Sequence, residues 1–162
     1  MNTVSYSNEA VQNFIINEFV PLKMEVSFTR PYELMERYMV RWTPTLLVED
    51  AEGKVQHQMV GFVPPDDLLA HLKLGKGMFY FNSGKLEEAA GWFRRVFEEH
   101  PKSGPAPEAV FYLGVAGYRL THKPSHLRTA YDTLLAGYPE SEWSRRAVAY
   151  SAIPKEEQPA HA

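Results

Sequence analysis

The most informative feature of this 162-residue sequence is an absence, because it contains no cysteine. Without a thiol, the chain can form no disulfide, no thiolate metal site and no cysteine nucleophile. Blocks of like charge are missing as well, since the net charge of -3 is spread along the chain. The sequence therefore gives no indication of a nucleic-acid partner or of an anionic membrane surface.

Long apolar runs are also missing. No segment approaches the roughly 18 consecutive apolar residues that a membrane-spanning helix needs, and no basic stretch followed by an apolar one opens the chain. We therefore expect no membrane contact and, if Met1 is the natural start, a location in the cytoplasm. The hydrophobic content of 44% is enough for a globular core.

Residues 1–73 alternate between helix and strand signals, which predicts an α/β arrangement. A helix is expected in "SNEAVQNFIINEF", with Ser7 as its N-cap, and a strand is expected over 19–26. A short helix follows in "RPYELMERYMV". The segments "TLLVED" and "KVQHQMVGF" predict a hairpin that turns at Gly53, and Pro64 and Pro65 are expected to start a helix through "DDLLAHLKL".

From residue 73 onward the sequence shows helical periods only. The expected helices cover 73–82, 85–99, 106–120, 126–136 and 142–151. They are separated by the Gly-, Pro- and Ser-containing segments "NSG", "HPKSGP", "THKPS" and "GYPES". The polar tail 152–162, with two prolines, is expected to be disordered.

This helical part repeats itself, and position 138 of the second copy corresponds to position 100 of the first. "HPKSGPAPEAV" at 100–110 matches "YPESEWSRRAV" at 138–148, and the same repeat offset pairs Tyr80 with Tyr118. An internal helical repeat is therefore predicted over 74–151, and two unrelated helical hairpins are the alternative.

The first copy, 73–101, resembles a tetratricopeptide repeat. The residues that carry the resemblance are Gly77, Tyr80, Gly84, Ala89, Phe93 and Pro101. The second copy is degenerate, because Leu127 stands where a small alanine is expected and His122 stands where the turn glycine is expected. With its "YPxS" turns it resembles the longer-period repeats of bacterial envelope proteins.

The tetratricopeptide resemblance implies a concave groove that binds a partner's peptide. The groove residues implied by the alignment are Met78, Phe81, Asn82, Tyr112, Ala116 and Arg119. The alternative is that these side chains pack against the first domain or a terminal helix.

The segment "VRWTPTLLVEDAEGKV", followed by "VGF", resembles the back half of the thioredoxin superfamily. The resemblance covers 1–73 and implies a cis bond between Thr43 and Pro44. It also implies that the loop of Trp42, Thr43 and Pro44 binds extended substrates. The segment 1–26 resembles the one that follows a C-x-x-C-x-x-M motif, with Met1 as the last residue of that motif. The first strand and the dithiol are therefore expected to be missing.

Other chemistry is poorly supported by the sequence. His122 and His126 have the spacing of two metal ligands on one helix face, but Pro124 between them favours a solvated turn. His57 and His71 are expected at the surface. We expect no catalytic residue, no metal and no cofactor.

The sequence thus predicts a truncated thioredoxin-like α/β domain over 1–73, joined to an all-α tetratricopeptide-like domain over 74–151. The favoured function is non-catalytic protein–protein interaction with a protein or peptide partner. One alternative is the C-terminal part of a longer thiol-disulfide oxidoreductase whose dithiol lies upstream of Met1, and another is a structural assembly subunit. The missing strand leaves two expectations, since either 19–26 closes onto 45–50 or two chains form a homodimer through open sheet edges.

Overall fold

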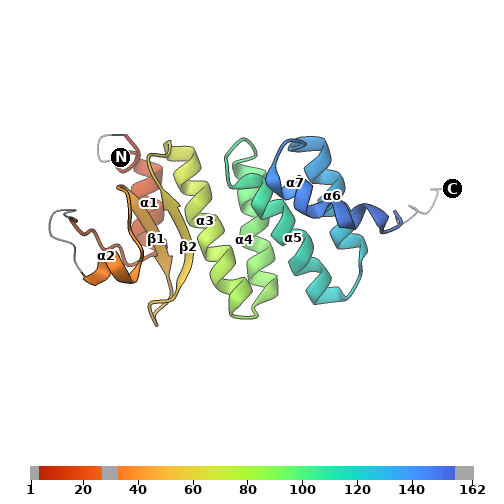
Figure 1. Cartoon of the computed structure of the whole chain (residues 1–162), viewed down its shortest axis with the longest axis horizontal. Helices are drawn as coiled ribbons and strands as arrows, with labels where there is room; N and C mark the ends of the chain where they lie inside the picture. Colours follow the sequence, from red (N-terminus) through yellow and green to blue (C-terminus); the bar gives the residue numbers. More distant parts are fainter. Residues whose placement is uncertain (1–3, 27–32, 156–162) are drawn as a thin grey trace.

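The computed structural model describes residues 4–26 and 33–155. In chain order the elements are α1 (Glu9–Glu18), α2 (Glu33–Arg37), β1 (Thr45–Glu49), β2 (Val55–Val60), α3 (Pro65–Asn82), α4 (Leu86–Glu99), α5 (Ala106–Thr121), α6 (Ser125–Gly137), α7 (Glu142–Arg146) and the 3-10 helix η1 (Ala147–Ala152). Figure 1 shows an elongated molecule, with α1, α2 and the hairpin toward one end, α3, α4 and α5 in the middle, and α6 and α7 toward the other end.

The sheet is the hairpin that the sequence predicts. Strands β1 and β2 pair antiparallel with Thr45 opposite Val60, and the connection contains Gly53 at a φ of 76°. The inward side chains of the hairpin pack with α1 and α3 in one core cluster, formed by Val11, Val48, Met59, Leu68 and Leu72. The hairpin is therefore covered on one face by two helices.

The first helix begins one residue later than expected. Asn8, and not Ser7, is the N-cap of α1, and its side chain accepts a hydrogen bond from the backbone N–H of Val11 at 3.2 Å. Ser7 instead donates its hydroxyl to the carbonyl of Val4. Both residue types cap helices well, so the sequence could not choose between neighbours.

The strand expected over 19–26 is absent. These residues form neither helix nor strand, and the sheet of the described part of the chain consists of β1 and β2 alone. The expected closure of 19–26 onto β1 is therefore wrong. The alternating pattern indicates which side chains could share a face, but a strand also needs a neighbour for its backbone groups.

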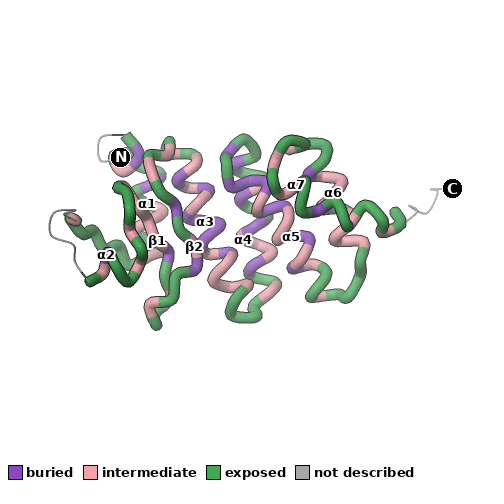
Figure 2. Tube along the Cα trace, viewed as in Figure 1, coloured by how far each residue is buried: buried purple, intermediate pink, exposed green. Residues whose placement is uncertain are grey.

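Helix α3 runs without a break through the predicted boundary at 73/74, so the separate helix expected over 73–82 is its second half. Its side chains belong to two core clusters. Leu68 and Leu72 pack toward the hairpin, and Ala70 and Leu74 pack toward α4. Figure 2 shows the buried positions concentrated along α3, α4 and α5. The α/β part and the helical part thus share one helix.

The helical hairpins α3–α4 and α5–α6 have corresponding bounds at the repeat offset. Shifting α4 by this offset gives 124–137, and α6 spans Ser125–Gly137. The turn residues also correspond, because Gly84 has a φ of 76° and its repeat equivalent, His122, has a φ of 57°. The helix expected over 142–151 is divided into α7 and η1.

Candidate functional site

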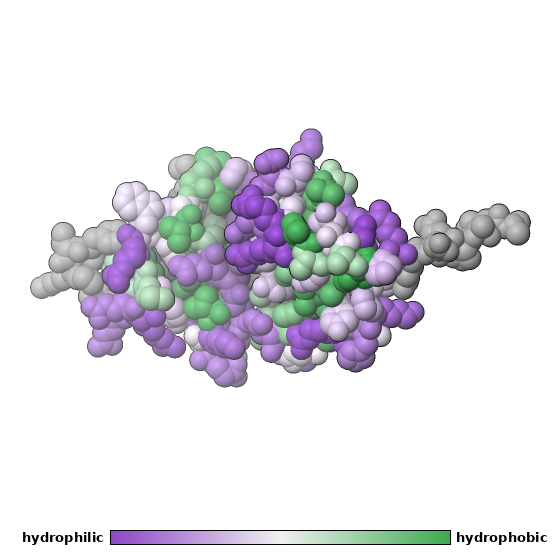
Figure 3. Space-filling model, turned by 45° about the vertical axis from the view of Figure 1, so that its right-hand side comes forward, coloured by the Kyte–Doolittle hydropathy of each residue, from purple (hydrophilic) through white to green (hydrophobic). Residues whose placement is uncertain are grey.

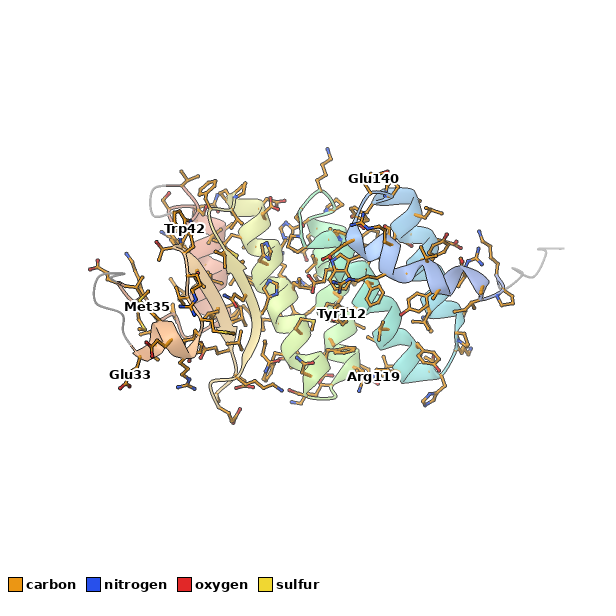
Figure 4. All side chains as sticks on the ribbon, viewed as in Figure 1. Glu33, Met35, Trp42, Tyr112, Arg119 and Glu140 are labelled. Carbon is orange, nitrogen blue, oxygen red and sulfur yellow. The ribbon has the colours of Figure 1, made fainter. Side chains whose placement is uncertain are left out.

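A surface that we call the aromatic face is built from three helices: Phe81 of α3, Tyr112 and Arg119 of α5, and Trp143 of α7. The ring centroids of Phe81 and Tyr112 are 5.4 Å apart, and those of Tyr112 and Trp143 are 5.6 Å apart. The guanidinium carbon of Arg119 lies 4.8 Å from the centroid of Phe81. Figure 4 labels Tyr112 and Arg119 on α5 in the middle of the molecule.

The structure brings together only part of the predicted groove. Phe81, Tyr112 and Arg119 lie together, and Met78 is half-buried against the same core cluster. Ala116 is wholly buried, so it has no surface to offer a partner. The amide of Asn82 donates to the Oε1 of Gln56 on β2 at 2.8 Å, so this donor is already used within the chain.

Trp143 is the member of the aromatic face that the sequence reasoning missed. Its ring also contacts Phe111, with centroids 5.2 Å apart, and lies under the guanidinium of Arg146 at 4.5 Å. A tryptophan in the turn region after the second repeat was the available signal. It gives no indication by itself of which earlier helix the ring meets.

A carboxyl group lies beside these rings. Burial raises the pKa of Glu108 to about 7, and the neighbouring Glu142 carboxylate also raises it, whereas Arg146 lowers it. Burial likewise raises the pKa of Tyr112, with the Glu108 carboxylate acting in the same direction. At neutral pH, Glu108 is therefore divided between its neutral and charged forms.

The predicted loop of Trp42, Thr43 and Pro44 lies at the end of the hairpin. The Thr43–Pro44 peptide bond is cis. The carbonyl of Pro44 accepts a hydrogen bond from the backbone N–H of Gly61 at 2.8 Å, and the Trp42 carbonyl accepts one from the Thr45 hydroxyl at 2.7 Å. The Trp42 side chain is 67% exposed and lies well apart from Tyr112 in Figure 4. The two predicted binding regions thus form separate surfaces.

A buried polar network joins α3 to the end of α4, and the sequence reasoning did not find it. The Nδ1 of His100 bonds to Asp66 at 2.6 Å, and the Nε2 of His100 lies 2.6 Å from the Nζ of Lys73. Lys73 also forms an ion pair with Glu99. Because Lys73 and His100 are buried and each has hydrogen-bonding partners, we interpret the network as a structural connection between α3 and the end of α4.

His57 and His71 are not the surface residues that the sequence suggested. The Nε2 of His57 lies 2.9 Å from the Nδ1 of His71, and the two rings are stacked between β2 and α3. Burial lowers the pKa of His57 to about 4, and the charge of His71 acts in the same direction. Across residues 4–26 and 33–155, no three His, Asp or Glu side chains gather so as to hold a metal ion.

The N-terminal part of the chain matches a protein-family model. Residues 3–76 match the model of the thioredoxin-like domain. The N-terminal part of the chain carries a thioredoxin-like domain. This domain holds α1, α2 and the hairpin, and its matched region ends inside α3. It has no cysteine, so the chain has no thiol redox site.

No curated protein and no solved structure matches the chain significantly. Within the part of the chain that the structure describes, no helix has the length and apolar character to cross a membrane.

Proposed function

We propose that this chain is a non-catalytic protein–protein interaction protein in which the thioredoxin-like domain is followed by tetratricopeptide-type helical repeats. In this proposal the aromatic face binds an extended peptide segment of a partner protein. The observation that carries the proposal is the meeting of Phe81, Tyr112 and Arg119, which come from two helices that are not consecutive in the chain.

The chemistry of the aromatic face suits a peptide. Tyrosine, tryptophan and arginine are the residues that most often dominate the binding energy of protein interfaces. Arg119 is exposed and forms no ion pair within residues 4–26 and 33–155, so its guanidinium is free to bind a carboxylate or a backbone carbonyl. In Figure 3 the visible face mixes apolar and hydrophilic side chains, as interfaces of non-obligate complexes do.

The correspondence of the two helical hairpins supports the repeat assignment. Their bounds agree at the repeat offset, and both first helices are followed by a residue with positive φ. Repeats of this kind stack side by side and present a continuous surface for binding. The aromatic face extends over α3, α5 and α7, which are alternate helices of such a stack.

The test is to select peptides from a random library on the pure chain and to measure their affinity by calorimetry. We expect Arg119→Ala to weaken binding about tenfold or more, because an anchor at an interface centre is removed. Arg94→Ala is the matched control, since Arg94 is an exposed arginine on α4 outside the aromatic face. Equal affinity of the Arg119 variant and the wild-type chain would contradict the proposal. A stable self-oligomer that selects no peptide would favour the structural assembly subunit.

A second candidate is favoured by the thioredoxin-like match: the chain is then the C-terminal part of a longer thiol-disulfide oxidoreductase. That activity requires a dithiol encoded upstream of Met1. Translation of the genomic sequence upstream in the same frame decides between the two candidates. A strand followed by C-x-x-C supports the oxidoreductase, and a stop codon supports the interaction protein.

A further inference from the structure

The segment directly after α1 exposes apolar side chains in a regular pattern. Val20 is 97% exposed, Leu22 is 83% exposed and Met24 is 44% exposed. Lys23 and Glu25 alternate with them, so an extended chain would place apolar and charged residues on opposite faces. Scattered apolar residues on a surface are ordinary, but three at alternate positions would give an extended segment one apolar face.

The charges of this segment are complementary to themselves. If two copies run antiparallel with Met24 opposite Met24, then Lys23 of each copy faces Glu25 of the other. On the other face, Leu22 faces Val26. Directly opposed residues of opposite charge stabilise an antiparallel pair, and so do opposed apolar residues.

Neighbouring registers lose this match. If Lys23 is placed at the centre, it faces itself, and if Glu25 is placed at the centre, it also faces itself. Like charges directly opposite one another destabilise a strand pair. If the two-fold axis instead lies between two residues, so that Lys23 faces Met24, the apolar residues of one copy face the charged residues of the other. Among these registers, only the one centred on Met24 opposes apolar residues on one face and opposite charges on the other.

We propose that two copies of this chain associate through residues 22–26, which pair as an antiparallel ribbon about a two-fold axis at Met24. The pairing supplies the backbone partner that this segment lacks within the described part of its own chain. A two-fold interface closes on itself, so the assembly stops at a dimer. In Figure 1 this segment lies at the hairpin end of the molecule, so the proposal is independent of the aromatic face.

Charge reversal and its rescue test the register. The wild-type chain is expected to give twice the 18.5 kDa mass of one chain in light scattering at micromolar concentration. Lys23→Glu and Glu25→Lys should each raise the dimer dissociation constant about tenfold, because each creates two opposed like charges. The double variant should restore the wild-type value. A monomeric wild-type chain, or a dimer that neither reversal weakens, would overturn the proposal.

The absence of cysteine permits a second test by oxidative cross-linking. Met24→Cys should form a disulfide-linked dimer rapidly, because residue 24 faces its own copy. Leu22→Cys is the control: residue 22 faces 26, so two copies of it lie about 13 Å apart at roughly 3.3 Å per residue, too far for a disulfide. Equal cross-linking of the two variants would overturn the register. A mixture of Leu22→Cys and Val26→Cys chains should cross-link to each other.

Discussion

At the scale of single residues, the turns after α3 and α5 depend on two residues with positive φ, Gly84 and His122. Gly84 follows α3 in a left-handed cap, where the N–H of Lys85 bonds to the carbonyl of Tyr80 and the N–H of Gly84 bonds to that of Phe81. His122 takes a similar conformation after α5. Glycine adopts this conformation without steric cost, whereas a side chain with a Cβ does not.

His122→Gly is therefore expected to raise the free energy of unfolding by about 0.5 kcal/mol, with the greater freedom of glycine in the unfolded chain offsetting part of the gain. Gly84→Val should lower it by about 1–2 kcal/mol. No atom lies within 4 Å of a Cβ built on Gly84, so that cost is conformational. Lys102→Ala, at an exposed site, is the control. Urea denaturation measures all three, and equal stability of the His122 and Gly84 variants would contradict the turn assignment.

The Glu108 carboxyl makes the free energy of unfolding of this chain depend on pH. The folded chain holds a proton on Glu108 up to about pH 7, whereas the unfolded chain releases it near pH 4.5. Between these values the folded state binds more protons, so the free energy of unfolding decreases as the pH rises.

Glu108→Gln removes that dependence. Because Glu108 is still partly exposed, solvent screening reduces the effect, and we expect the variant to be more stable than wild type by about 1 kcal/mol at pH 8. The two should be equally stable at pH 4. Thermal unfolding at the two pH values is the measurement, and Glu98→Gln, at an exposed site on α4, is the control. A constant difference at both pH values would show that Glu108 is not the titrating group.

At the scale of elements, α3 is the component that both halves of the molecule depend on. Its glycines allow close approach on two sides: a Cβ at Gly75 would lie 2.8 Å from Val48, and one at Gly77 would lie 2.5 Å from the ring of Phe93. The network of Lys73 and His100 adds a polar tie to α4 on the same helix. Both glycines lower helix propensity, but they permit the contacts that hold α3 in place.

Gly77→Ala should therefore destabilise the chain by about 1–3 kcal/mol, because the wholly buried ring of Phe93 must move. Gly91→Ala is the matched control, since it also lies within a helix but has no atom within 4 Å of its Cβ position. The control should stabilise the chain by about 0.5–1 kcal/mol through helix propensity. Chemical denaturation of both variants gives the comparison, and a neutral Gly77 variant would refute the close packing of α3 on α4.

At the scale of the whole molecule, the chain carries a thioredoxin-like domain but contains no cysteine. This combination leads to an expectation about its redox activity. The pure chain should not accelerate the reduction of insulin disulfides by dithiothreitol, because thiol-disulfide exchange requires a thiolate nucleophile. Insulin turbidity measured with and without the chain provides the test. A reproducible acceleration would contradict this expectation, because the chain has no thiol that could carry out the exchange.

The local features of the molecule could be predicted from its sequence. The hairpin around Gly53, helices α4 to α6 and the thioredoxin-like character of the N-terminal part follow from periodicity, turn residues and a short motif, which act between near neighbours in the chain. Of the candidate site, the tetratricopeptide alignment named Phe81, Tyr112 and Arg119, whose side chains lie together in the structure. Their binding of a peptide stays a prediction.

Features that depend on distant partners could not be predicted in this way. Residues 19–26 have the pattern of a strand but no neighbour to pair with in the described part of the chain, and α3 continues through an expected break because packing on both sides stabilises it. Burial of Ala116, the contacts of Trp143 and the network around Lys73 likewise depend on which helices meet. Periodicity indicates which face of an element is apolar, but only the packed structure decides which other element covers that face.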